Sequence, residues 1–256
     1  MTTALITGGS SGIGAEFARQ LAARGHDLVL VARDPDRLAV IAAELEAARG
    51  IRVEIMPADL SLRDDVQRVA DRLLDEQRPI ELLINNAGFG VSKPLVTADV
   101  ARHEYALDVM VRAVLVLGST AAEAMRQRGH GAILNVSSIA SLTTMGHYSA
   151  IKAWVTAYSQ GLSVELRGSG VRVTALLPGW VRTEFHERAS IRASAIPSGL
   201  WIDLPRLVRV ALRALDRGRA VSVPTTRFRM IGWLLRHLPR SAVRAISGVV
   251  GRSRRS

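Results

Sequence analysis

Short apolar runs alternate with longer amphipathic stretches along most of the chain. The short runs are rich in β-branched residues, which is typical of buried strands, and the longer stretches repeat their apolar positions at helical spacing. The pattern predicts strands at residues 4–7, 27–32, 52–56, 82–85, 132–136, 172–177 and 220–223. It predicts helices at residues 12–24, 35–49 (capped by Asp34), 61–76 (capped by Ser61), 103–128, 148–168 and 204–217.

The order of these elements predicts the fold class. Strands that are apolar throughout, each followed by a helix, indicate a parallel sheet that is covered on both faces. We therefore expect an α/β fold, a doubly wound parallel sheet of the Rossmann type with helices on both faces, whose ligands bind at the carboxyl ends of the strands. Residues 1–226 should form one domain, and residues 227–256 a basic helical extension.

Composition narrows the classes of function. The 256 residues include no cysteine, and the six histidines show neither HxH nor HExxH spacing, so we expect no metal site. The chain begins without a basic and apolar leader, and nowhere do about 18 apolar residues run together, so we expect a cytoplasmic protein.

The net charge of +11 is concentrated at the C-terminus. Residues 227–256 contain eight arginines and no acid, and +11 minus +8 leaves only +3 for residues 1–226. Because nucleic-acid enzymes more often carry their positive charge across the main cleft, no nucleic-acid partner is expected.

A glycine-rich turn lies between the first predicted strand and the first predicted helix. Glycines permit a tight turn, and the N-terminus of the helix offers unpaired N–H groups to a pyrophosphate. The alternative is a merely flexible loop, but the strand–turn–helix context favours a dinucleotide site. The predicted contacts are Gly8, Ser10, Ser11, Gly12, Ile13 and Gly14.

The second strand ends in Ala32-Arg33, where an acidic residue would hold the ribose 2′-hydroxyl of NAD. An arginine at this position pairs with a 2′-phosphate, which favours NADP(H). The alternative is an ordinary solvated surface arginine.

Tyr148 and Lys152 are four residues apart and share one face of a predicted helix. Two charges about 4 Å apart interact by roughly 4 kcal/mol, so the ammonium is expected to lower the pKa of the phenol by about three units. The chain has only two lysines, Lys93 and Lys152, against 32 arginines. A lysine at this place therefore suggests chemistry that arginine cannot perform.

These motifs resemble the classical short-chain dehydrogenase/reductase family, and the stretch from Val31 to Leu38 with the arginine-rich ending resembles its bacterial ketoreductase-like subgroup. The resemblance implies an NADP(H)-dependent oxidoreductase that interconverts a carbonyl and a secondary alcohol on a hydrophobic substrate. Residues 180–201 would form the substrate lid. The resemblance implies further cofactor contacts at Asp59, Leu60, Asn86, Ala87, Gly88, Tyr148, Lys152, Pro178, Gly179, Val181 and Thr183.

The resemblance also implies the catalytic roles. The Tyr148 phenol would protonate the carbonyl oxygen, Ser138 would bind the same oxygen, and Lys152 would hold the ribose hydroxyls. Ser138 has an alternative role as a turn hydroxyl that satisfies backbone groups.

Three features depart from the family pattern. The loop from Ser138 to Tyr148 is shortened by three residues, Ile151 replaces a serine or threonine, and Met110 occupies the place of an asparagine. In the family, the carbonyl of that asparagine holds a relay water, and its side chain steadies a local helix distortion. The alternative function is therefore a catalytically weakened NADP-binding scaffold or sensor.

The resemblance implies a homodimer or homotetramer, paired through the helices predicted at residues 103–128 and 148–168. The basic extension could contact an anionic membrane weakly, which would make the protein membrane-peripheral. Alternatives are a helix packed on the domain with solvated arginines, and an adaptor whose primary function lies in the extension. Removal of the extension after Pro224 is expected to leave cofactor binding intact.

Overall fold

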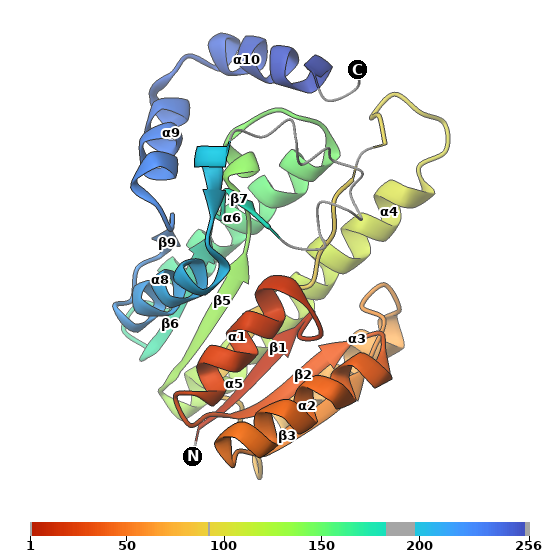
Figure 1. Ribbon diagram of the computed structural model, residues 1–256, viewed down its shortest axis with the longest axis vertical. Coiled ribbons are helices and arrows are strands. Elements are labelled where there is room, and N and C mark those ends of the chain that lie inside the picture. Colours follow the sequence, from red (N-terminus) through yellow and green to blue (C-terminus); the bar gives the residue numbers. More distant parts are fainter. Residues whose placement is uncertain (1, 92, 183–197, 254–256) are drawn as a thin grey trace.

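The computed structural model describes residues 2–91, 93–182 and 198–253 and contains a seven-stranded parallel sheet (Figure 1). The strand order is β3-β2-β1-β4-β5-β6-β9, so the order reverses at β1 and β4, as in doubly wound folds. The predicted fold class is thereby confirmed. The strands are β1 (Thr3–Thr7), β2 (Asp27–Ala32), β3 (Val53–Pro57), β4 (Leu82–Asn85), β5 (Gly131–Val136), β6 (Val171–Leu176) and β9 (Val221–Ser222).

Helices cover both faces of the sheet. Successive strand residues point to opposite faces, and Ile6 accordingly packs in one core while Leu5 packs in the other. The first face carries α1 (Gly12–Ala22), α2 (Pro35–Arg49) and α8 (Leu204–Asp216). The second face carries α3 (Arg63–Leu74), α4 (Ala101–Leu107), α5 (Ala113–Arg128) and α6 (His147–Glu165).

The two predicted helix caps have different outcomes. The Asp34 carboxylate accepts hydrogen bonds from the backbone N–H groups of Asp36 and Arg37, each at 3.1 Å, so that cap is confirmed. The prediction for Ser61 is wrong, because α3 begins two residues later, at Arg63. The backbone N–H of Ser61 instead donates to the Asp59 carboxylate, which forms a turn ahead of the helix.

The long helix predicted at residues 103–128 is interrupted by a π-helical turn, η1 (Asp108–Arg112). An ion pair of 2.7 Å between Asp108 and Arg112 lies on this turn. Ala101–Arg128 is long and apolar enough to cross a membrane by length and composition, and within the described chain only this helix is. Half of its apolar window is buried inside the protein.

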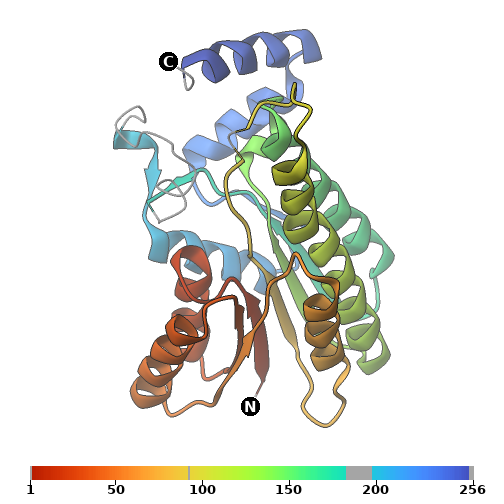
Figure 2. The same cartoon turned by 90° about the vertical axis from the view of Figure 1, so that its right-hand side faces the viewer.

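The C-terminal extension forms two helices, α9 (Thr226–His237) and α10 (Arg240–Ser253). Figures 1 and 2 place both at the end of the molecule opposite the N-terminus. Nearby, β7 (Trp180–Val181) and β8 (Trp201–Ile202) form a separate two-stranded sheet, in which Val181 is opposite Ile202.

Candidate active site

The glycine-rich turn joins β1 closely to α1. Gly8 has a φ of +67°, and a Cβ at Gly14 would lie 2.1 Å from the Gly8 carbonyl oxygen. Only glycine at these two positions allows the strand and the helix to approach in this way. Ser11 precedes α1 without a capping side-chain hydrogen bond, so no side chain occupies the first N–H groups of the helix. This cradle fits the pyrophosphate of a dinucleotide.

Asn86 and Thr7 hold the next strand against the glycine-rich turn. The Asn86 amide nitrogen donates to the carbonyl oxygens of Thr7 (2.9 Å) and Gly8 (3.2 Å). The Thr7 hydroxyl accepts from the backbone N–H groups of Asn86 (2.9 Å) and Ala87 (3.1 Å). The side chain of Asn86 therefore fixes the turn.

Arg33 lies exposed at the end of β2, and its guanidinium donates to the Tyr105 hydroxyl at 3.0 Å. The neighbouring acid, Asp34, is engaged as the cap of α2 and pairs with Arg37 at 3.5 Å. The Arg33 side chain thus lies exposed at this strand end, while the adjacent carboxylate is engaged in capping α2 and in an ion pair.

The other predicted cofactor contacts lie at the same edge of the sheet. Asp59 and Leu60 follow β3, where Leu60 is buried and the Asp59 carboxylate accepts from the Ser61 N–H at 2.9 Å. Pro178, Gly179 and Val181 follow β6. Thr183 lies outside the described residues, as do residues 183–197 of the predicted lid.

Ser138, Tyr148 and Lys152 come together where β5 ends and α6 begins. The Ser138 hydroxyl lies near the Tyr148 phenol and favours the ionised form of the phenol. The Ser138 hydroxyl also accepts from the backbone N–H of Ala140 at 3.1 Å, so it has the turn role as well. The Lys152 ammonium donates to the Val136 carbonyl at 2.8 Å and lies 5.7 Å from the centroid of the Tyr148 ring.

The pKa of the Tyr148 phenol departs from the sequence-based prediction. Burial raises this pKa to about 12, although the nearby Ser138 hydroxyl acts in the opposite direction. Burial also lowers the pKa of Lys152 to about 8. The predicted lowering of the phenol pKa is therefore wrong. Lys152 is directed at Val136, and desolvation disfavours the charged form of both groups.

A buried polar network, which the sequence analysis missed, positions α6 against the sheet. The Ser137 hydroxyl donates to the Lys152 carbonyl at 2.7 Å and is 2.7 Å from the Thr156 hydroxyl. The Asn135 amide donates to the Ser159 hydroxyl at 2.9 Å. Polar residues at helical spacing after Lys152 were the available signal. The network fixes the position of Lys152 along the length of β5.

Met110 lies in the π-helical turn and is fully buried. A Cβ at Gly88 would lie 3.1 Å from the Met110 sulfur and 3.6 Å from the Lys152 nitrogen, so both side chains border Gly88. The helix distortion is thus present with methionine in the place of asparagine. The thioether fills the space without an unpaired polar group.

The C-terminal extension contacts the candidate site directly. A Cβ at Gly179 would lie 2.2 Å from the ring of Phe228, which is buried in α9. A Cβ at Gly232 would lie 3.3 Å from Ile139 and 3.4 Å from Leu142, in the turn after Ser138. The inner face of α9 therefore packs on both the predicted nicotinamide turn and the turn that carries Ser138.

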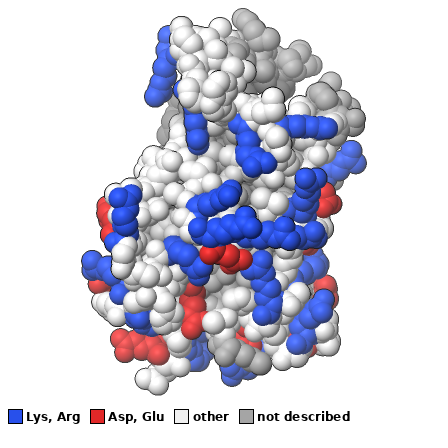
Figure 3. Space-filling view, turned by 90° about the vertical axis from the view of Figure 1, so that its left-hand side faces the viewer, with Lys and Arg blue, Asp and Glu red and all other residues white. Residues whose placement is uncertain are grey.

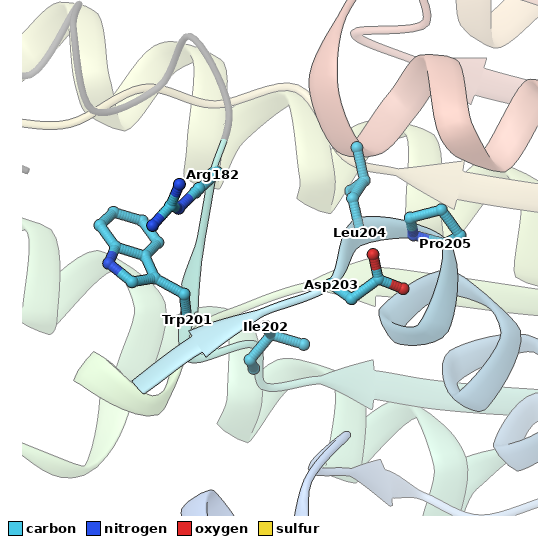
Figure 4. Close-up of a pocket in the computed structure, with 6 residues that line it drawn as sticks. All are labelled: Arg182, Trp201, Ile202, Asp203, Leu204 and Pro205. Carbon is cyan, nitrogen blue, oxygen red and sulfur yellow. The ribbon is translucent and has the colours of Figure 1, made fainter. Parts of the chain in front are cut away.

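A pocket of about 350 Å³ adjoins this region, between the small sheet and the start of α8 (Figure 4). The Arg182 guanidinium lies 5.2 Å from the centroid of the Trp201 ring, and Figure 4 shows the two on one side of the pocket. The Asp203 carboxylate accepts from the Arg206 N–H at 3.0 Å and caps α8. None of the described residues that line this pocket is a predicted catalytic residue.

Comparison with known proteins agrees with the fold. The short chain dehydrogenase family matches residues 2–193, and the chain belongs to this family of oxidoreductases. It is similar to a short-chain dehydrogenase from Sphingobium yanoikuyae solved in complex with NADPH, with 38% identity, a TM-score of 0.83, and coverage of 94% of this chain and 98% of that one.

Two further proteins are similar. The bulky-bulky ketone specific alcohol dehydrogenase from Comamonas testosteroni is 33% identical, with a TM-score of 0.80 and coverage of 94% of this chain and 96% of that one. An uncharacterized oxidoreductase of Mycobacterium tuberculosis is 33% identical over 84% of this chain and 86% of that protein.

Proposed function

We propose that the protein is an NADP(H)-dependent reductase that interconverts a carbonyl and a secondary alcohol on a hydrophobic substrate. The observation that carries this proposal is the grouping of Ser138 and Tyr148, with Lys152 beside the Tyr148 ring, at the carboxyl end of β5. The named ketone specificity of the Comamonas relative supports it.

The residues present have defined tasks in such a reaction. The Ser138 and Tyr148 hydroxyls converge and together can bind one carbonyl oxygen, as an oxyanion site requires. A bound nicotinamide supplies the hydride. With a pKa raised to about 12, the phenol stays protonated at neutral pH, which suits donation of a proton to the carbonyl oxygen. Lys152, whose ammonium lies 5.7 Å from the centroid of the Tyr148 ring, would place a positive charge beside the phenol and would hold the ribose hydroxyls of the cofactor.

The preference for NADP(H) rests on Arg33, which is exposed at the end of β2 beside an acid that is already engaged. The NADPH complex of the Sphingobium relative supports it. We expect NADPH to bind about tenfold tighter than NADH, a difference of about 1.4 kcal/mol, and Arg33→Asp to reverse the order. Fluorescence titration with both cofactors tests this, and equal affinities in the parent protein would contradict it.

Reduction is tested by NADPH oxidation against a panel of bulky ketones. Tyr148→Phe should abolish turnover and leave cofactor affinity nearly intact, because it removes the proton and little else. The rival function, a weakened scaffold or sensor, is favoured by Met110 and by the short loop after Ser138. Tight NADPH binding without turnover on any ketone would support that rival.

The remaining parts of the proposal concern assembly and location. We propose a homodimer or homotetramer, supported by exposed apolar side chains on the long helices, including Leu115 and Val164. We also propose a cytoplasmic location, which the fold supports. We also propose peripheral contact with anionic membranes through the extension.

A further inference from the structure

Helix α9 has two apolar faces, of which only one is covered by protein. Phe228 and Gly232 are buried against the domain. Met230 is 68% exposed, Trp233 62% and Leu234 49%. At about 100° per residue, these three lie roughly 140–240° around the helix from Phe228 and so form its outward face. Three large apolar side chains exposed together on one helix face indicate a binding surface.

Arginines border this outward face on both sides. Arg229 and Arg236 lie roughly 80–100° from Phe228, and Arg227 lies roughly 260° from it. All three are exposed, and none forms an ion pair with a carboxylate in the described ranges. The last acidic residue of the chain is Asp216. An apolar stripe between basic edges is the arrangement of a helix that lies in a membrane interface.

The position of α9 in the molecule leaves this face accessible. Figures 1 and 2 place α9 and α10 at one end of the molecule. Figure 3, which looks onto the side where α8 and α9 lie, shows blue side chains and no red ones among the described residues at that end. Arg240 and Arg244 of α10 are also exposed and extend the basic surface.

We propose that the outward face of α9, formed by Met230, Trp233 and Leu234 with the flanking arginines, docks on an anionic phospholipid surface. Two copies of the chain paired face to face would bring arginines of the same sign together, which opposes self-association. Anionic headgroups neutralise the same arginines while the apolar stripe enters the boundary of the acyl chains. This docking does not depend on the proposed reaction.

The test is co-sedimentation of the purified full chain with vesicles of phosphatidylglycerol and of phosphatidylcholine, without cofactor or substrate. Binding is expected to phosphatidylglycerol at low salt, to weaken with added salt, and to be much weaker to phosphatidylcholine. Met230→Ser/Trp233→Ser should reduce binding at least about tenfold, because it removes most of the exposed apolar area. Arg229→Gln/Arg236→Gln should reduce the affinity and its salt dependence.

Two matched control variants change exposed residues that are far from α9 in the fold. Val40→Ser removes a side chain that is 69% exposed on α2, and Arg49→Gln/Arg63→Gln removes two exposed arginines, so both should bind as the parent does. Thermal melting verifies that each variant is folded. The proposal is overturned if the parent ignores phosphatidylglycerol vesicles at low salt. It is also overturned if the α9 variants bind vesicles with the affinity of the parent, or if their only effect is to dissociate an oligomer of the chain.

Discussion

At the scale of single residues, Lys152 has the ionisation that most directly limits the proposed reaction. Its pKa of about 8 means that the ammonium loses its proton as pH rises through this value, while Tyr148 remains protonated. We predict that kcat/KM for ketone reduction falls above about pH 8, because kcat/KM reports ionisations of the free enzyme. The measurement is a pH profile of NADPH-dependent reduction.

The two lysines of the chain provide the control for this profile. Lys93→Arg should keep the decline near pH 8, because Lys93 lies in the loop before α4 and is absent from the site. Lys152→Arg should remove the decline at a reduced overall rate, because a guanidinium stays charged but is bulkier. An unchanged decline in Lys152→Arg would assign it to another group.

Met110 supports a second prediction at this scale. Its main-chain carbonyl is retained in the π-helical turn, but the thioether offers no strong hydrogen bond to a relay beside Lys152. We predict that Met110→Asn raises kcat by up to about tenfold, roughly 1.4 kcal/mol in the barrier, with little change in cofactor affinity. Steady-state kinetics with an NADPH titration measures both. A lower kcat or an unfolded protein would show that the site is built around methionine.

Much of the candidate site could be predicted from residue spacing, because glycines, strand ends and an i, i+4 pair are local signals. The direction of the Tyr148 pKa shift could not. It depends on burial and on the direction of the Lys152 side chain, whose ammonium donates to the Val136 carbonyl on another element of the fold. The spacing of two residues in the sequence predicts that their charges lie close together, but it does not predict how far each group is removed from solvent.

At the scale of elements, alternation of apolar runs and helical periods was sufficient for the sheet and its covering helices. The family resemblance implied a local helix distortion at Met110, but hydrophobic periodicity alone did not predict the π-helical turn, because Ala101–Arg128 keeps a continuous helical pattern across it. The two-residue strands β7 and β8 were missed because so short a run has no period. The contact between α9 and Gly179 is likewise long-range in sequence.

The packing of α9 changes the prediction for the C-terminal extension. Phe228 is 4% exposed and abuts Gly179, so Phe228→Ala should cost about 3–5 kcal/mol in stability and weaken cofactor binding. Truncation after Pro224 should weaken cofactor binding for the same reason, contrary to the expectation from the sequence alone. Thermal melting and NADPH titration measure the two effects.

A substitution at Gly232 distinguishes an effect of α9 on the geometry of the site from an effect on the stability of the fold. Gly232→Val should push α9 away from Ile139 and Leu142. We expect a large fall in kcat/KM for ketones and a small fall in melting temperature. Met230→Ala on the exposed face of the same helix should leave the rate in solution unchanged. Equal rates for the two variants would show that α9 does not position the Ser138 turn.

At the scale of the whole molecule, the long helices α5 and α6 present apolar side chains to solvent. Leu115 is 43% exposed on α5 and Val164 is 60% exposed on α6. The Tyr158 hydroxyl of α6 donates to the Leu115 carbonyl at 3.4 Å, so the two helices lie side by side and form one surface. A surface of two adjacent helices suits a two-fold symmetric interface, in which each copy presents the same patch.

We therefore predict a homodimer or homotetramer at micromolar concentration, which light scattering measures as molar mass. Leu115→Asp/Val164→Asp should yield monomers, because pairing would bury four carboxylates against apolar side chains, and unpaired buried charges cost several kcal/mol each. Val40→Asp alters a side chain that is 69% exposed on α2, away from this surface, and should leave the assembly intact. A monomeric parent protein would refute the prediction. An unchanged assembly in the double variant would place the interface elsewhere, and vesicle binding through α9 should persist in the monomeric variant.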